Sequence, residues 1–204
     1  MIQQLYYTSC ESGKSLDGKS GFGIRAMSAS LSPEIGRTLE QHLGYQLPLG
    51  TRPTTDTAAK APIRLAFVDV PAVGLVLHHA AYVGKDPTTD RFGNWFSHAV
   101  VNLPPEFDAA RAIGTWGSRF WKTRDADGPT RLSDVSELPT AGGLSIDLAR
   151  QWASTDRGAH LLKFVLNALL GGHVNAGRLF VAAPAQEVAL GIYAATQLLP
   201  RRFA

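Results

Sequence analysis

The sequence lacks the features that define disulfide-rich, zinc-binding or membrane-spanning proteins. Its 204 residues include one cysteine, Cys10, which excludes an intrachain disulfide framework and a cysteine-rich zinc site. No apolar run approaches the roughly 18–20 residues of a membrane-spanning helix. The first residues also lack the basic and apolar regions of a signal peptide. We therefore expect a soluble, cytoplasmic protein.

Charged residues are scarce as well. Asp, Glu, Lys and Arg make up 18% of the chain, below the usual share of about 25%. This composition fits a chain that lies against partner proteins, although richness in Ala and Gly is a simpler explanation. The net charge of +3 is dispersed, with no basic run longer than Arg201-Arg202. Nucleic-acid-binding proteins usually gather basic residues on one face, so we expect no nucleic-acid partner.

Hydrophobic residues, at 45% of the chain, suffice for a sizeable core, and their periodicity predicts an α+β fold. The pattern indicates a mainly antiparallel sheet with flanking helices, followed by a helix-helix-strand-helix segment. Strands are predicted over residues 3–8, 21–28, 63–70, 73–83, 94–101 and 178–183. Helices are predicted over residues 32–44, 108–120, 145–154, 157–170 and 184–199.

A long polar stretch rich in Pro and Gly, over residues 122–143, indicates that the chain has two parts. We expect an N-terminal α+β domain over residues 1–143 and a helix-rich C-terminal segment over residues 144–204. The isolated strand at 178–183 needs pairing partners. It either joins the N-terminal sheet or belongs to the start of a truncated second domain, and we expect the chain to be a fragment of a larger architecture.

The stretch from residue 73 to residue 103 carries most of the polar residues that could act in function. Two apolar, strand-like runs flank a turn-forming centre, which predicts a β-hairpin with a long charged tip. The hairpin contains three of the six histidines and a polar cluster, which are His78, His79, His98, Asp90, Arg91 and Asn94.

His98 is the leading catalytic candidate. It lies on the same predicted strand face as Asn94, and an imidazole beside an amide could orient a ligand or act as a general base. The alternative is a partly buried histidine that is hydrogen-bonded to the backbone. Cys10 could form a nucleophilic pair with His98, although a single cysteine is usually an inert, partly buried side chain.

The adjacent histidines His78 and His79 point to opposite faces of a strand, so only one of them can share a site with His98. A two-histidine metal site with Asp86 or Asp90 is conceivable. However, the spacing does not match the HExxH motif. We expect no metal and no cofactor.

Three segments together resemble the N-terminal part of the bacterial GTPase-associated protein family. They are LYYTS at 5–9, GFGIRAMSASLS at 21–32 and DRFGNWFSHAVV at 90–101. The last segment is the most specific, through Arg91, Gly93, Asn94, Phe96 and His98. The chain departs from the family pattern near Thr88-Thr89.

Members of this family are multi-domain proteins encoded beside GTPases and other NTPases in conflict systems. The resemblance implies an adaptor or regulatory module and supplies no fixed active site.

We therefore expect a non-catalytic adaptor or protein-interaction module of a bacterial NTPase-associated conflict system. Its partners would be proteins, such as a neighbouring GTPase or another component of the NTPase system. The alternative is an enzyme or nucleotide-binding domain. Its ligand-binding candidates are Asp90, Arg91, Asn94 and His98, and its catalytic candidates are His98 and Cys10.

Overall fold

The computed structural model describes residues 1–124, 128–140, 143–171 and 183–199. Contacts divide the chain into two compact units. The first unit comprises residues 1–105 and 119–138, and the second comprises residues 106–118 and 139–204. The sequence predicts one boundary at residue 143, whereas in the structure residues 106–118 pack with the C-terminal helices.

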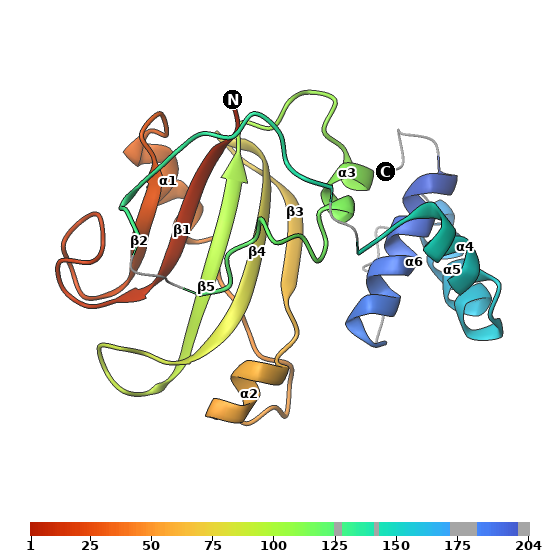
Figure 1. Cartoon of the computed structure of the whole chain (residues 1–204), viewed down its shortest axis with the longest axis horizontal. Helices are drawn as coiled ribbons and strands as arrows, with labels where there is room; N and C mark the ends of the chain where they lie inside the picture. The colour runs from red at the N-terminus through yellow and green to blue at the C-terminus, as the bar shows by residue number, and fades with distance from the viewer. Residues whose placement is uncertain (125–127, 141–142, 172–182, 200–204) are drawn as a thin grey trace. The chain divides into compact units, whose positions relative to one another are not determined.

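The first unit is built on a six-stranded sheet (Figure 1), which confirms the α+β class. The strand order is β3-β4-β5-β1-β2-β6. Neighbouring strands are antiparallel except β2 and β6, which are parallel. The strands are β1 (Gln3–Cys10), β2 (Gly21–Ser28), β3 (Arg64–Val70), β4 (Gly74–Lys85), β5 (Phe92–Val101) and β6 (Arg131–Leu132).

The predicted hairpin is present as β4 and β5, and it sets the register of the sheet. His79 lies opposite His98, and Ala81 lies opposite Phe96. The register shifts beside Gly84, which has a φ of +100°, a conformation that favours glycine. Both strands are rich in β-branched and aliphatic residues, which is why the sequence predicts this hairpin.

Two helices flank the strands of the first unit. Helix α1 (Pro33–Glu40) begins as predicted, because the Ser32 side chain accepts a hydrogen bond from the Glu34 N–H. It ends at Glu40, four residues before the predicted end. Helix α2 (Thr55–Lys60) lies in a stretch that the sequence predicts to be loop, since six residues are too few to show helical periodicity.

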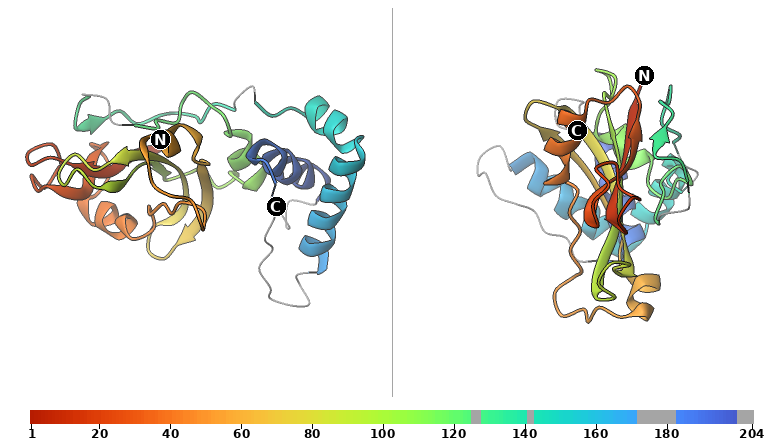
Figure 2. Two further views of the ribbon diagram at one scale, coloured as in Figure 1. Left: turned by 90° about the horizontal axis from the view of Figure 1, so that it is seen from below. Right: turned by 90° about the vertical axis from the view of Figure 1, so that its left-hand side faces the viewer.

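The two faces of the sheet are covered differently (Figure 2, left). One face packs on α1 through a buried cluster, which contains Leu5, Leu31, Leu39, Leu43, Val70, Val76, Ala99 and Val101. The opposite face is covered by residues 119–124 and 128–138, which we call the connector. Paired backbone hydrogen bonds between Ile2 and Val135, of 2.8 and 2.9 Å, attach the connector to the N-terminus.

The described part of the second unit is helical. Its helices are α3 (Ala109–Gly114), α4 (Ile146–Ala153), α5 (Asp156–Gly171) and α6 (Ala185–Leu198). Helix α3 stops six residues before its predicted end at residue 120, near Gly114 and Gly117, and glycine weakens a helix. Gly117 has a φ of +76°. Residues 178–182 of the predicted last strand lie outside the described residues.

Candidate functional site

His98 is completely buried on β5, and both of its ring nitrogens are hydrogen-bonded. The Lys122 backbone N–H donates to His98 Nδ1 at 3.3 Å, so the ring proton lies on Nε2 and is donated to Gln4 Oε1 at 3.0 Å. Gln4 Nε2 donates in turn to the Ser133 carbonyl at 2.6 Å. This set of bonds, the His98–Gln4 network, joins β5, β1 and the connector.

Aromatic rings enclose the same imidazole. The ring centroids of Tyr6, Phe120 and Trp121 lie 4.7, 4.8 and 5.1 Å from that of His98. Burial lowers the pKa of His98 to about 3, with smaller effects from His79 and Lys122. His98 is therefore neutral at physiological pH. It also lacks the exposed nitrogen that a general base needs to reach a substrate.

The two histidines of β4 lie on opposite faces of the sheet. His79 lies opposite His98, and its ring stacks on Trp121 with 5.5 Å between centroids. His78 is completely buried, and neither of its ring nitrogens has a hydrogen-bond partner among the described residues. Burial lowers the pKa of both His78 and His79 to about 4. The register therefore identifies His79 as the one that lies beside His98.

Asn94 is buried and bridges three strands. Its Oδ1 accepts hydrogen bonds from the Ser9 N–H and the Thr8 hydroxyl, both at 3.2 Å. Its Nδ2 donates to the Lys85 carbonyl at 3.5 Å. These bonds join the ends of β1, β4 and β5 beside the register shift at Gly84.

Asp90 and Arg91 lie in the exposed turn between β4 and β5. The Asp90 carboxylate is 2.8 Å from Lys85 Nζ, and exposed ion pairs of this kind contribute about 0–1 kcal/mol. Asp86 organises the turn, because its Oδ1 accepts from the N–H and the hydroxyl of Thr88 at 2.7 and 2.6 Å. Burial acts to raise the pKa of Asp86, but hydrogen bonds, led by those from Thr88, hold it below its usual value.

Cys10 is buried at the end of β1, and its Sγ lies 3.7 Å from the Thr8 carbonyl oxygen. Cys10 lies opposite Gly21, whereas His98 lies opposite Tyr6, four residues earlier on β1. At about 3.3 Å per residue, the two positions are about 13 Å apart along the strand. The structure therefore does not bring Cys10 and His98 together as a nucleophilic pair.

The predicted site residues are thus dispersed. Asp90 and Arg91 are exposed in the turn. Asn94 joins the ends of three strands, and His98 lies four residues further along β5. No group of three or more His, Cys, Asp and Glu side chains that could hold a metal ion occurs among the described residues.

A small cavity of about 260 Å³ lies over the sheet beneath the connector. It is lined by Tyr6 and Phe96, whose ring centroids are 5.3 Å apart, and by Arg25, Lys122 and Arg124. Arg25 Nη2 donates to the connector at the Gly128 carbonyl, at 3.1 Å. Sequence patterns do not reveal this grouping, because β2 and the connector are far apart in the chain.

Comparison with protein families identifies a family that matches the first unit. The model of the family described as GTPase-associated protein 1, N-terminal domain type 2, matches residues 1–139. The chain belongs to this family. The match covers the whole sheet and the connector, and it confirms the resemblance to the GTPase-associated protein family. In this GTPase-associated domain, Asn94 and His98 join neighbouring strands, and Arg91 lies exposed in the turn of the main hairpin.

One relative is the protein "Putative ESX-1 scaffolding and assembly protein SaeB" of Mycolicibacterium smegmatis. It is 30% identical over 130 residues, which cover 58% of this chain and 14% of the relative. The GTPase-associated chain therefore corresponds to a small part of that relative. No solved structure matches the chain.

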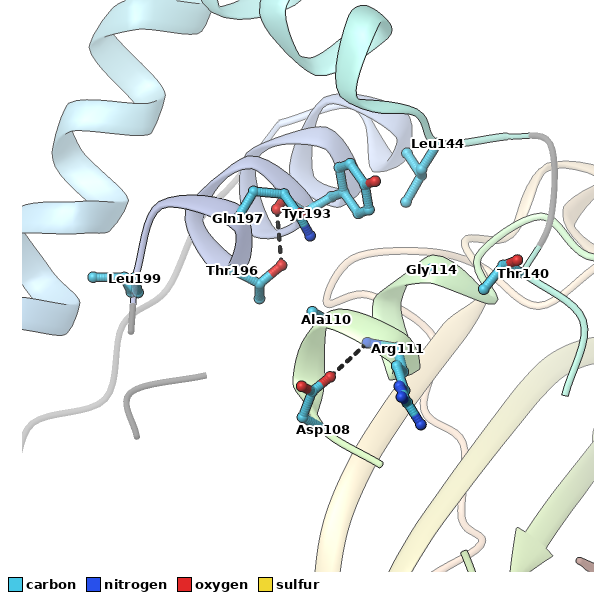
Figure 3. Close-up of a pocket in the computed structure, with 10 residues that line it drawn as sticks. All are labelled: Asp108, Ala110, Arg111, Gly114, Thr140, Leu144, Tyr193, Thr196, Gln197 and Leu199. Carbon is cyan, nitrogen blue, oxygen red and sulfur yellow. Dashed lines mark hydrogen bonds between the residues drawn. The ribbon is translucent and has the colours of Figure 1, made fainter. Parts of the chain in front are cut away.

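The helical unit carries a polar pocket of about 410 Å³ between α3 and α6 (Figure 3). The Asp108 carboxylate at its edge caps α3 by accepting from the Arg111 N–H at 2.9 Å. On α6, the Thr196 hydroxyl donates to the Tyr193 carbonyl at 2.8 Å. These polar groups therefore form hydrogen bonds with the backbones of the two helices that line the pocket.

Large apolar side chains are exposed on the helices of this unit, which the helical periodicity of the sequence does not predict. They are Ile146, Leu148, Phe164, Leu169, Leu170, Ile192 and Leu198. Helix α5 has 16 residues, of which Gly158 and Val165 are the buried ones. None of the described helices combines the length and apolar character that crossing a membrane requires.

Proposed function

We propose that this chain is a non-catalytic adaptor, a protein-interaction module of a bacterial NTPase-associated conflict system. The His98–Gln4 network carries the proposal. The residue best suited to acid–base chemistry is completely buried and has both ring nitrogens bonded within the domain. Its role is then to hold the connector on the sheet.

The comparisons support an adaptor role. The family is described as GTPase-associated, and the relative from Mycolicibacterium smegmatis is named for scaffolding and assembly. Both descriptions concern association with other proteins. We therefore propose a neighbouring GTPase, or another NTPase of the same system, as the partner.

The surface of the helical unit supports the same role. Among the described residues of α5, Phe164 and Leu170 are 55% and 52% exposed. Large apolar side chains exposed on a helix are available for contact with another protein.

The test is direct binding between the purified full chain and the purified GTPase encoded beside it. Binding is measured by calorimetry, with the GTPase loaded with GDP or with a non-hydrolysable GTP analogue. We expect a saturable 1:1 complex with a dissociation constant in the micromolar range or tighter. The chain alone should hydrolyse neither nucleotide.

Two results would overturn the proposal. One is the absence of binding to the GTPase in both nucleotide states. The other is nucleotide turnover by the chain alone that is lost on replacing Arg91, an exposed residue whose substitution leaves the core intact.

A further inference from the structure

The cavity of about 260 Å³ between the sheet and the connector has the features of a ligand site, and we call it the connector cavity. On the side of the sheet, it is lined by the buried side chains of Ala26 and Phe96. On the side of the connector, it is lined by Lys122 and Arg124, which are exposed. The cavity therefore opens to solvent beside these two cations. All of its lining residues belong to the first unit.

The interior of the connector cavity suits an apolar group. The rings of Tyr6 and Phe96, whose centroids are 5.3 Å apart, line it from the sheet, and Pro129 and Leu132 line it from the connector. An apolar cavity of about 150 Å³ is large enough to bind benzene, and an added ring gains favourable contacts with other aromatic rings. The connector cavity therefore has room for one aromatic ring and a short chain.

The charges around the connector cavity have one sign. Its three charged lining residues are the cations Arg25, Lys122 and Arg124, and no carboxylate lines it among the residues that the structure describes. Arg25 is only 6% exposed and donates to the Gly128 carbonyl at 3.1 Å, so it holds the connector over the cavity. Lys122 and Arg124 form no ion pair within the described part of the chain. Two cations at the opening of an apolar cavity favour a ligand that carries a carboxylate.

We propose that the connector cavity binds a small aromatic carboxylate. The ring of the ligand packs on Tyr6 and Phe96, and its carboxylate lies at the opening beside Lys122 and Arg124. The ligand then contacts the sheet and the connector at once, so its binding stabilises the connector on the sheet. This site lies within the first unit and goes beyond the proposed adaptor function.

The probe is 3-phenylpropionate, compared with its neutral analogue 3-phenylpropanamide and with acetate, which has the charge without the ring. NMR of the full chain follows the ring signals of Tyr6 and Phe96. We expect 3-phenylpropionate to shift both signals, with a dissociation constant of about 1 mM or tighter. It should bind about tenfold more tightly than the amide, because the amide lacks both ion pairs. Acetate should shift neither signal.

Three results would overturn the proposal. The first is that the ring signals of Tyr6 and Phe96 do not move with 3-phenylpropionate. The second is equal affinity for the acid and the amide, which would remove the role of the two cations. The third is that acetate produces the same shifts as 3-phenylpropionate, which would indicate a general effect of anions.

Matched lysine variants locate the carboxylate. Lys122→Gln should weaken 3-phenylpropionate about threefold and leave 3-phenylpropanamide unchanged, because only an exposed ion pair is lost. Lys19 is an exposed lysine of the same unit that does not line the cavity. Lys19→Gln should therefore change the affinity by no more than about 1.5-fold. Equal effects of the two variants would contradict the position assigned to the carboxylate.

Hydrogen exchange tests the contact with the connector. The Val135 N–H donates to the Ile2 carbonyl at 2.9 Å, and it exchanges when the connector leaves the sheet. A concentration of 3-phenylpropionate ten times its dissociation constant should slow this exchange about tenfold. Unchanged exchange at Val135 would show that the ligand does not bind between the connector and the sheet.

Discussion

His98 Nε2 and Gln4 Oε1 lie 3.0 Å apart across neighbouring strands. Gln4 is opposite Val100, and His98 is opposite Tyr6, so the two side chains meet diagonally. Both are buried, and a buried polar group that loses its partner is costly. The pair therefore fixes how β1 and β5 meet and how the connector lies on them.

Replacing Gln4 by Met should destabilise the first unit by about 1–3 kcal/mol. The apolar side chain keeps much of the volume but leaves the His98 Nε2–H and the Ser133 carbonyl unpaired. Hydrogen exchange of the β5 amides measures the loss in that unit alone. Gln41→Met, the same change at an exposed position, should cost no more than about 0.5 kcal/mol. Equal losses would show that the network contributes no stability.

Local signals made much of the sheet predictable. The alternation of Phe96, His98 and Val100 identifies β5, and the Ser32-Pro33 pair marks the start of α1. Alternation also separates His78 from His79. These features depend on neighbouring residues and so are visible in the sequence.

The functional interpretation of His98 depended on distant contacts. Its two hydrogen-bond partners, Gln4 and the Lys122 backbone, are 94 and 24 residues away. Strand periodicity specifies the face of a residue and not what covers it. The sequence of the connector predicts a polar loop. The covering of His98 by the connector could therefore not be predicted.

Replacing Asn94 by Ala and replacing Asp90 by Asn should differ sharply in their effect on stability. Asn94→Ala removes the acceptor of the Ser9 N–H and the Thr8 hydroxyl and should cost about 1–3 kcal/mol. Asp90→Asn removes the exposed ion pair with Lys85 and keeps a residue type that tolerates the φ of +55° at this position, so it should cost at most about 1 kcal/mol. Urea unfolding followed by tryptophan fluorescence gives both values. A larger loss for Asp90 would contradict the structural role of Asn94.

Replacing His78 by Leu should leave the stability unchanged or raise it by about 1 kcal/mol at pH 7.5. The His78 ring is buried, and neither nitrogen has a hydrogen-bond partner among the described residues, so its burial is uncompensated. Leu has a similar volume and no polar atom. The urea midpoint measures the change. A loss above about 2 kcal/mol would indicate that the ring makes an interaction essential to the core.

The three buried histidines of the hairpin should make the first unit sensitive to acid. In the unfolded chain they titrate near the ordinary pKa of about 6.5, whereas the folded values are about 4 for His78 and His79 and about 3 for His98. Below pH 6.5 the unfolded state therefore binds more protons, and the free energy of unfolding falls as the pH falls towards 4. Each histidine contributes at most about 1.4 kcal/mol per pH unit. Urea midpoints between pH 7.5 and pH 5 should decline only below about 6.5, and His78→Leu should remove about a third of that slope. An unchanged slope in the variant would show that His78 is protonated in the folded domain.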